Sequence, residues 1–281
     1  MREIDVKEIT KAVSQLFQEA CYYLPEDVLN ALKQARQTEE SPIGCNVLDR
    51  IIENVDISAK EQIPICGDTG VAVVFLEIGQ DIHIVGGDIY CAINEGVRQG
   101  YAEGYLRKSM VSQPFSARTN TGDNTPAMIH TDIVPGDKLK IVALPKGAGS
   151  ENMACLAMLS PAQGRQGVID FVVNAVDKAG SNPCPPHIVG VGIGGTVEKT
   201  IMLAKRALLR RVGEPNPGAE VADLETEILA RVNRLGIGPA GYGGRATALA
   251  VHVEVFPSHI ASLPVAVNIQ CWCARQKVAI L

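Results

Sequence analysis

The chain has 281 residues, of which 46% are hydrophobic and 20% are charged, and its formal net charge is −5. This balance excludes an intrinsically disordered chain, which would combine low hydrophobicity with high net charge, and no long basic run provides the electrostatic footprint of a nucleic-acid-binding protein. No apolar run reaches the roughly 18 residues that a membrane helix needs, and the acidic N-terminus lacks the apolar segment of a signal peptide, so we expect a cytoplasmic protein with no membrane partner.

The first 60 residues are expected to form helices. Apolar residues recur there at the spacing of one helical face, at Ile9, Val13, Leu16 and Ala20. A second helix is expected to begin at Pro25, because proline fits the first turn of a helix. Residues 47–52 indicate a third helix.

Beyond residue 60, strands and helices are mixed. Strands are expected over 70–78, 82–85, 187–191, 246–255 and 265–270, and helices over 93–106, 167–179, 196–211 and 219–235. Residues 128–144 predict a hairpin-like pair of strands, turned at Pro135-Gly136-Asp137. Because strands and helices do not alternate strictly, we expect the α+β class. We expect one domain over residues 1–281, in which a helical segment (1–60) precedes a core (61–281) with Gly/Pro-rich site loops at strand ends.

Five Gly/Pro-rich loops carry polar residues next to expected strands. They are PICGDTG (64–70), NTGDNTP (120–126), KGAGSEN (146–152), NPCPPH (182–187) and GVGIGGT (190–196). Functional groups concentrate in such loops. Cys66 and Cys184 lie in two of them, and the prolines around Cys184 fix its backbone. A rigid cysteine of this kind suits a metal ligand or, alternatively, a structural thiol.

Cys271 and Cys273 flank Trp272 just after an expected strand. This pattern fits a metal site, a redox pair or core packing. The eight cysteines are expected to be reduced in the cytoplasm, and they show no compact zinc or ferredoxin spacing, so the alternatives stay open. The other cysteines, in helical or apolar surroundings, are expected to fill the core: Cys21, Cys45, Cys91 and Cys155.

The GVGIGGT segment matches the G-x-G-x-x-G pattern of dinucleotide-binding folds, between an expected strand and an expected helix. The acidic residue that should end a further strand about 20 residues later is missing, because 213–218 is a turn-rich joint. Free N–H groups at a helix start still attract anions. A nucleotide- or phosphate-binding protein is therefore an alternative from another functional class.

Together with PVAVNIQC (264–271), these motifs occur in the order found in class I, iron–sulfur fumarate hydratases, which the chain resembles from about Ile63 to Leu281. Because the chain stops after the third cysteine motif, it resembles the separate α subunit of two-subunit fumarases and of the related L-tartrate dehydratases. The resemblance implies a [4Fe-4S] cluster held by Cys66, Cys184 and Cys271, with Cys273 as a bystander. A zinc-stabilised scaffold without catalysis is a further alternative.

The resemblance also implies that Asp68, Arg107, Gly149 and His259 face the substrate. It implies that the catalytic base lies on a β subunit, so that this chain carries none and works in a hetero-oligomer. The implied activity is the reversible hydration of fumarate to (S)-malate, a step of the tricarboxylic acid cycle. Gly67 stands where the family usually has glutamine, and L-tartrate or another hydroxy-dicarboxylate is therefore the alternative substrate.

Overall fold

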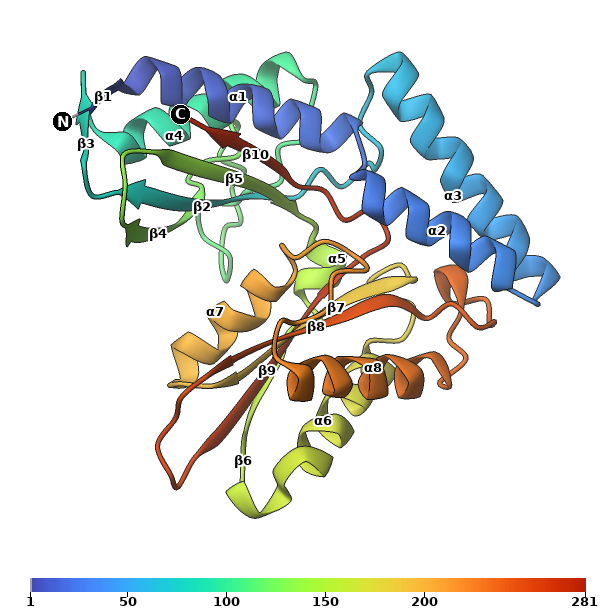
Figure 1. Cartoon of the computed structure of the whole chain (residues 1–281). Helices are drawn as coiled ribbons and strands as arrows, with labels where there is room; N and C mark the ends of the chain where they lie inside the picture. The colour runs from blue at the N-terminus through green and yellow to red at the C-terminus, as the bar shows by residue number, and fades with distance from the viewer. Residues whose placement is uncertain (1) are drawn as a thin grey trace. The chain divides into compact units, whose positions relative to one another are not determined.

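Figure 1 shows the computed structural model of the chain, which describes residues 2–281. It belongs to the α+β class, as predicted. Unit 1 comprises residues up to Leu24, Asn54–Ala148 and Arg275–Leu281, and unit 2 comprises Pro25–Glu53 and Gly149–Ala274. The expectation of one domain over residues 1–281 depends on how these two compact units are joined, and it stays a prediction. No helix within residues 2–281 is both long and apolar enough to cross a membrane.

Unit 1 is a sheet with the order β10-β5-β2-β4, packed against two helices. Its elements are β1 (Arg2–Asp5), α1 (Val6–Tyr22), β2 (Val71–Gly79), β3 (Ile82–Val85), α4 (Ile89–Glu103), β4 (Met128–Val134), β5 (Leu139–Lys146) and β10 (Lys277–Ile280). The apolar face predicted for the first helix is confirmed, since Ile9, Val13, Leu16 and Ala20 are all buried in α1. Gly96 lets α4 approach α1 closely, because a Cβ there would lie 2.6 Å from Thr10 O.

The hairpin-like pair predicted over residues 128–144 is wrong. Both strands and the turn exist, but β2 lies between β4 and β5, parallel to β4 and antiparallel to β5. The turn therefore passes across the end of β2, where Gly79 N donates to Lys138 O over 2.9 Å and Asp81 N donates to Gly136 O over 3.0 Å. The apolar run of β2 is buried on both sides, which suits a central strand better than an edge strand.

Unit 2 is a second sheet, with the order β6-β9-β7-β8. Its strands are β6 (Cys155–Leu159), β7 (His187–Gly194), β8 (Ala248–Phe256) and β9 (Leu263–Gln270). Its helices are α2 (Glu26–Thr38), α6 (Gly164–Ala179), α7 (Val197–Ala207) and α8 (Ala219–Asn233), with short turns η1 (Pro161–Gln163) and η2 (Pro239–Gly241). The boundary between the units falls inside α3 (Pro42–Glu61) and at the start of α5 (Ala148–Glu151).

The glycines of GVGIGGT have a packing role in β7. Val189 and Val191 face a core that α6 and α8 complete. Successive residues of a strand point to opposite faces, so Gly192 faces α7, where a Cβ would lie 2.1 Å from Thr200 O. Glycine in the strand thus allows α7 to pack directly against the backbone of β7.

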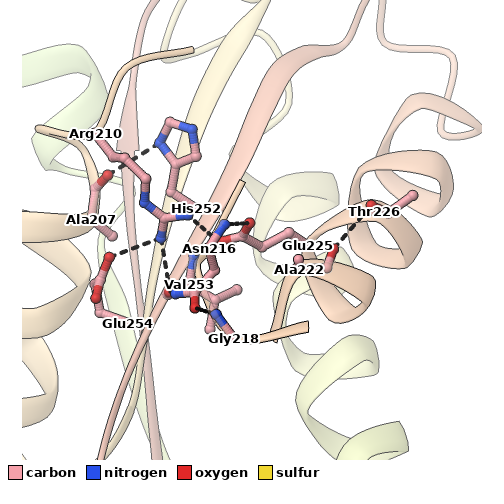
Figure 2. Close-up of polar contacts among 10 residues, drawn as sticks. All are labelled: Ala207, Arg210, Asn216, Gly218, Ala222, Glu225, Thr226, His252, Val253 and Glu254. Carbon is pink, nitrogen blue, oxygen red and sulfur yellow. Dashed lines mark hydrogen bonds and ion pairs between the residues drawn. The ribbon is translucent and has the colours of Figure 1, made fainter. Parts of the chain in front are cut away.

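The edge strand β8 is covered by polar side chains (Figure 2). Val253 donates its N–H to Glu225 Oε1 over 2.7 Å. Its carbonyl accepts from Arg210 Nη2 and Asn216 Nδ2, each over 2.9 Å. Arg210, whose side chain is 11% exposed, also pairs with Glu225 and Glu254 over 2.7 and 2.8 Å. An open edge invites pairing with another chain, and these largely buried contacts cover the edge of the sheet at Val253.

The cysteines expected to fill the core differ in burial. Cys21 is buried, Cys45 and Cys155 are half-buried, and Cys91 is exposed. The expectation for Cys91 is wrong because this residue lies in the first turn of α4, where its N–H donates to the capping residue Asp88 over 2.8 Å.

Candidate functional site

Cys66 lies in unit 1, half-buried in the loop between α3 and β2. Before it, Ile65 N donates to Cys21 O at the end of α1 over 2.9 Å. After it, the Tyr101 hydroxyl donates to Thr69 O over 3.1 Å. The backbone on both sides of Cys66 is therefore held by the helices of unit 1, and the thiol is presented by a fixed loop.

The Asp68 carboxylate is occupied by backbone groups. Its Oδ1 accepts from Gly70 N and its Oδ2 from Ala148 N, both over 2.9 Å. Arg275 lies close by, since a Cβ built on Gly147 would be 3.3 Å from Asp68 Oδ2 and 3.7 Å from Arg275 Nη2. Asp68, expected to face the substrate, thus joins the PICGDTG loop to the KGAGSEN loop.

Arg275 is a buried cation that the sequence motifs did not indicate. Its residue exposure is 1%, and it hydrogen-bonds the Cys21 thiol. Burial raises the pKa of Cys21 to about 11, although Arg275 favours the thiolate. Cys66 and Asp68 also raise the pKa of Cys21 electrostatically. These four groups therefore form one electrostatic cluster behind the Cys66 loop.

Arg107 is attached to the same loop through its backbone. Thr69 Oγ1 donates to Arg107 O over 2.9 Å. The buried Asn124 side chain accepts from Ser109 N over 2.7 Å and donates to Gly70 O over 3.2 Å. The Arg107 guanidinium is exposed and has no hydrogen-bond or ion-pair partner within residues 2–281. It is therefore available to bind an anion beside the PICGDTG loop.

Cys184 lies in unit 2, exposed, with a left-handed backbone (φ 52°). Its N–H donates to Ser181 O over 3.0 Å, and its carbonyl accepts from Trp272 N over 3.3 Å. Trp272 directly follows Cys271, so the loops that carry the second and third cysteines adjoin. This is the one part of the predicted cysteine constellation that a single unit brings together.

Cys271 is half-buried and its Sγ lies 3.7 Å from Cys273 O. Cys273 itself is only 1% exposed. All eight cysteines lie within the described residues and are free of disulfides. Of the C-x-C pair, Cys271 therefore has the more accessible thiol.

His187 follows Cys184 by three residues. It is 0% exposed, its N–H donates to Thr247 O over 2.8 Å, and neither ring nitrogen has a hydrogen-bond partner within residues 2–281. Burial lowers the pKa of His187 to about 4, so its imidazole is neutral at pH 7. A buried polar ring without a partner is uncommon.

We expect His187 to make unit 2 acid-sensitive. Above about pH 6.5 the ring is neutral whether the chain is folded or unfolded. Below it the unfolded chain takes up a proton that the folded chain, with a pKa of about 4, does not bind. Stability is therefore lost as pH falls, by about 2–3 kcal/mol between pH 7 and pH 4.5. Urea unfolding of the wild type and His187→Phe at both pH values measures this, and an equal loss in both proteins would contradict it.

Gly149 and His259 lie in different places in unit 2. Gly149 borders the Cys184 loop, since a Cβ on it would lie 3.1 Å from Asn182 O. His259 is exposed in the loop before β9, whereas Cys271 follows the other end of β9. The eight residues of β9 span ~26 Å at about 3.3 Å per residue. The structure thus brings Gly149 next to the Cys184 loop and leaves His259 at the opposite end of the sheet.

The chain matches the family described as fumarate hydratase (Fumerase) over residues 10–280. It belongs to this family of hydro-lyases. It is 46% identical over 278 residues to a putative L(+)-tartrate dehydratase subunit alpha of Methanocaldococcus jannaschii, with 96% of each chain covered. It is 30% identical over 274 residues to the L(+)-tartrate dehydratase subunit alpha of Escherichia coli strain K12, covering 96% of this chain and 90% of that one.

The residues of this fumarate hydratase family member fit an iron–sulfur cluster in their chemistry. Within residues 2–281, no group of three or more His, Cys, Asp or Glu side chains is placed to hold a metal ion. Within unit 2, the Cys184 and Cys271 loops adjoin, and both thiols are free of disulfides. Thiolates are the ligands that iron–sulfur clusters use.

Proposed function

We propose that the chain is the α subunit of a two-subunit, cytoplasmic [4Fe-4S] hydro-lyase that dehydrates a hydroxy-dicarboxylate. L(+)-tartrate is the first candidate substrate. The observation that carries this choice is the identity, over 96% of the chain, with relatives named for that activity and as alpha subunits. The interconversion of fumarate and (S)-malate is the second candidate, supported by the description of the family.

The proposed cluster ligands are Cys66, Cys184 and Cys271. They are the thiols that the resemblance to iron–sulfur fumarate hydratases implies, and thiolates are the usual ligands of such clusters. Within unit 2, Trp272 N donates to Cys184 O over 3.3 Å, so the loops of Cys184 and Cys271 adjoin. Within unit 1, contacts with Cys21 and Tyr101 hold the loop of Cys66.

The chain's own residues would bind and orient the substrate. The free guanidinium of Arg107 would pair with one carboxylate, a pairing that is often bidentate. Gly149, which has no side chain, would let the substrate approach the backbone closely. A [4Fe-4S] cluster with three protein thiolates would supply a Lewis-acidic iron for the departing hydroxyl group. Asp68 would hold the PICGDTG loop to the start of the KGAGSEN loop at Ala148.

The reaction removes a hydroxyl group from one carbon and a proton from the next, and the two leave as water. From tartrate the product is an enol, which tautomerises to a 2-oxo acid. From malate it is fumarate. The base that takes the proton belongs, in this proposal, to the partner subunit, as the resemblance to two-subunit fumarases implies.

The test is to purify the chain without oxygen, alone and with its partner subunit, and to measure iron, sulfide and turnover. We expect about four irons and four sulfides per chain. With the partner present, L(+)-tartrate should be dehydrated faster than malate. A colourless chain that takes up no iron would refute the proposal that the chain binds a cluster. An iron-loaded complex that prefers malate would instead make malate, and not tartrate, the first candidate substrate.

Gly67 is expected to set the substrate preference. It is exposed, and a Cβ added to it would meet nothing within 4 Å, so a side chain can be introduced without a clash. In Gly67→Gln the amide would fill space beside the Cys66 loop and offer a hydrogen bond worth ~1 kcal/mol. We expect the ratio of kcat/KM for malate to that for tartrate to change by about tenfold.

Gly67→Met is the matched control, because methionine has a similar length but no hydrogen-bonding amide. If only the volume of the side chain matters, both variants change the ratio equally. If the hydrogen bond matters, the glutamine variant alone favours malate. An unchanged ratio in both variants would show that residue 67 does not contact the substrate.

A further inference from the structure

Glu39 is a buried carboxylate at the turn between α2 and α3, 7% exposed. Four backbone N–H groups donate to it. Two of them, from Glu40 and Ser41, belong to its own turn (2.9 and 3.0 Å). The other two, from Arg245 and Ala246, lie 206 and 207 residues further along the chain, at 2.8 and 3.0 Å from Oε2.

The charge of Glu39 is stabilised by these contacts. Burial alone would raise its pKa, but the backbone hydrogen bonds outweigh burial and hold the pKa below its usual value. A carboxylate that accepts several backbone N–H groups strongly prefers its charged form. Glu39 therefore fastens the stem of a distant loop with a fixed negative charge.

That loop, residues 236–245 with the sequence GIGPAGYGGR, packs under the Cys184 loop. Ala240, itself in a left-handed conformation (φ 50°), donates its N–H to Pro185 O over 2.9 Å. Gly241 has no room for a side chain, because a Cβ there would lie 2.3 Å from Ser181 Cβ. The tip of the loop thus contacts the Cys184 loop on both sides of the cysteine.

The residues that follow the 236–245 loop also contact the segment that carries Cys184. Thr247, one residue after the Glu39 contacts, accepts the N–H of His187 over 2.8 Å. Its Oγ1 accepts the N–H of Gly238 over 3.3 Å. Glu39 thereby connects to the Cys184 loop through two routes, one by way of Ala240 and one by way of Thr247.

We propose that Glu39 and the 236–245 loop are positioning residues that hold the backbone of Cys184 in its left-handed conformation, ready to bind the cluster. The inference rests on the proposed function for the identity of the bound group. The contacts from Glu39 and the 236–245 loop to the Cys184 loop are present in the folded chain whatever group is bound. Glu39 does not contact the substrate, and it acts through the loop and Cys184.

The experiment compares Glu39→Gln with Glu40→Gln. Both remove one negative charge from the same turn, but the Glu40 side chain is exposed and pairs with the exposed Arg245 side chain rather than with the backbone of the loop. Hydrogen exchange of the full-length chain reports the amides of Ala240, His187 and Trp272. Loss of charge-assisted bonds at Glu39 should speed their exchange at least about tenfold, whereas Glu40→Gln should leave it unchanged. Exchange in α6 and α8 should stay unchanged in both variants.

The second readout is iron release from chain loaded without oxygen and then exposed to a chelator. Glu39→Gln should release iron at least about tenfold faster than the wild type and Glu40→Gln. Unchanged exchange and unchanged iron release would overturn the inference while leaving the cluster assignment intact. If the wild type binds no iron, the proposed function fails, and the exchange experiment still decides whether the support exists.

Gly241→Ala covers the case in which Glu39→Gln unfolds, which fast exchange in α6 and α8 would reveal. The added methyl group must displace the loop tip from Ser181, and Glu39 keeps its partners. The same local increase in exchange at Ala240 and Trp272, with faster iron release, supports the inference. Normal exchange at both positions overturns it.

Discussion

Replacing Cys184 with glycine is expected to abolish cluster binding and, at the same time, to stabilise the cluster-free chain. The thiol is one of three proposed ligands, so iron should fall from about four per chain to below about one, and turnover by the complex should fall on the order of 10³-fold. The backbone of Cys184 is left-handed (φ 52°), a conformation that glycine adopts more easily than any residue with a Cβ. The substitution should therefore raise the free energy of unfolding by about 1 kcal/mol. Iron analysis and urea unfolding measure the two effects.

The matched control is Cys273→Ser, two residues after Cys271. Cys273 is 1% exposed, so this variant should lose some stability and keep its iron. The two substitutions thus have opposite effects on both readouts. A chain that keeps its iron after Cys184→Gly would exclude Cys184 as a ligand. A large loss of stability in the same variant would instead identify Cys184 as a structural residue.

Local patterns predicted most of the fold, because they record which face of an element is buried. The spacing of Ile9, Val13 and Leu16 predicted α1 and its buried face. The turn at residues 135–137 was also correct, yet the pairing of the strands on either side was wrong. A turn signal shows where the chain reverses, and it does not show that a third strand, β2, lies in between. Strand order depends on contacts that no local window contains.

Sequence motifs indicated the candidate cysteines, whereas residues held by contacts between distant parts of the chain gave no sequence signal. The NPCPPH and NIQC segments drew attention to Cys184 and Cys271, whose loops adjoin. Glu39 gave no signal, because its partners are backbone amides 206 and 207 residues away. Arg275 resembles a solvated charge in the sequence but is buried beside Asp68. His259 and Cys271 lie at opposite ends of β9, and the length of this strand could have been read from the sequence.

Replacing Glu225 with alanine is expected to destabilise unit 2 by about 2–3 kcal/mol, because the Arg210 guanidinium, only 11% exposed, loses one of its two carboxylate partners and Val253 N–H loses its acceptor. Glu225 is 6% exposed and bonds both Arg210 and the N–H of Val253 (Figure 2). Its other oxygen accepts from Asn216 N over 3.0 Å. Urea unfolding followed by the fluorescence of Trp272, the only tryptophan, reports this unit directly.

Two further variants separate the causes. Glu227→Ala removes a carboxylate from the same helix that pairs with Arg165 and Arg231 near the surface, and exposed pairs contribute little. Arg210→Met combined with Glu225→Leu removes both charges of the pair, which should recover part of the loss. Recovery should be incomplete, because the N–H and carbonyl of Val253 then lose their partners and the edge of β8 opens. If Glu225→Ala costs no more than Glu227→Ala, the network does not protect this edge, and α8 packing alone must hold β8 in the sheet.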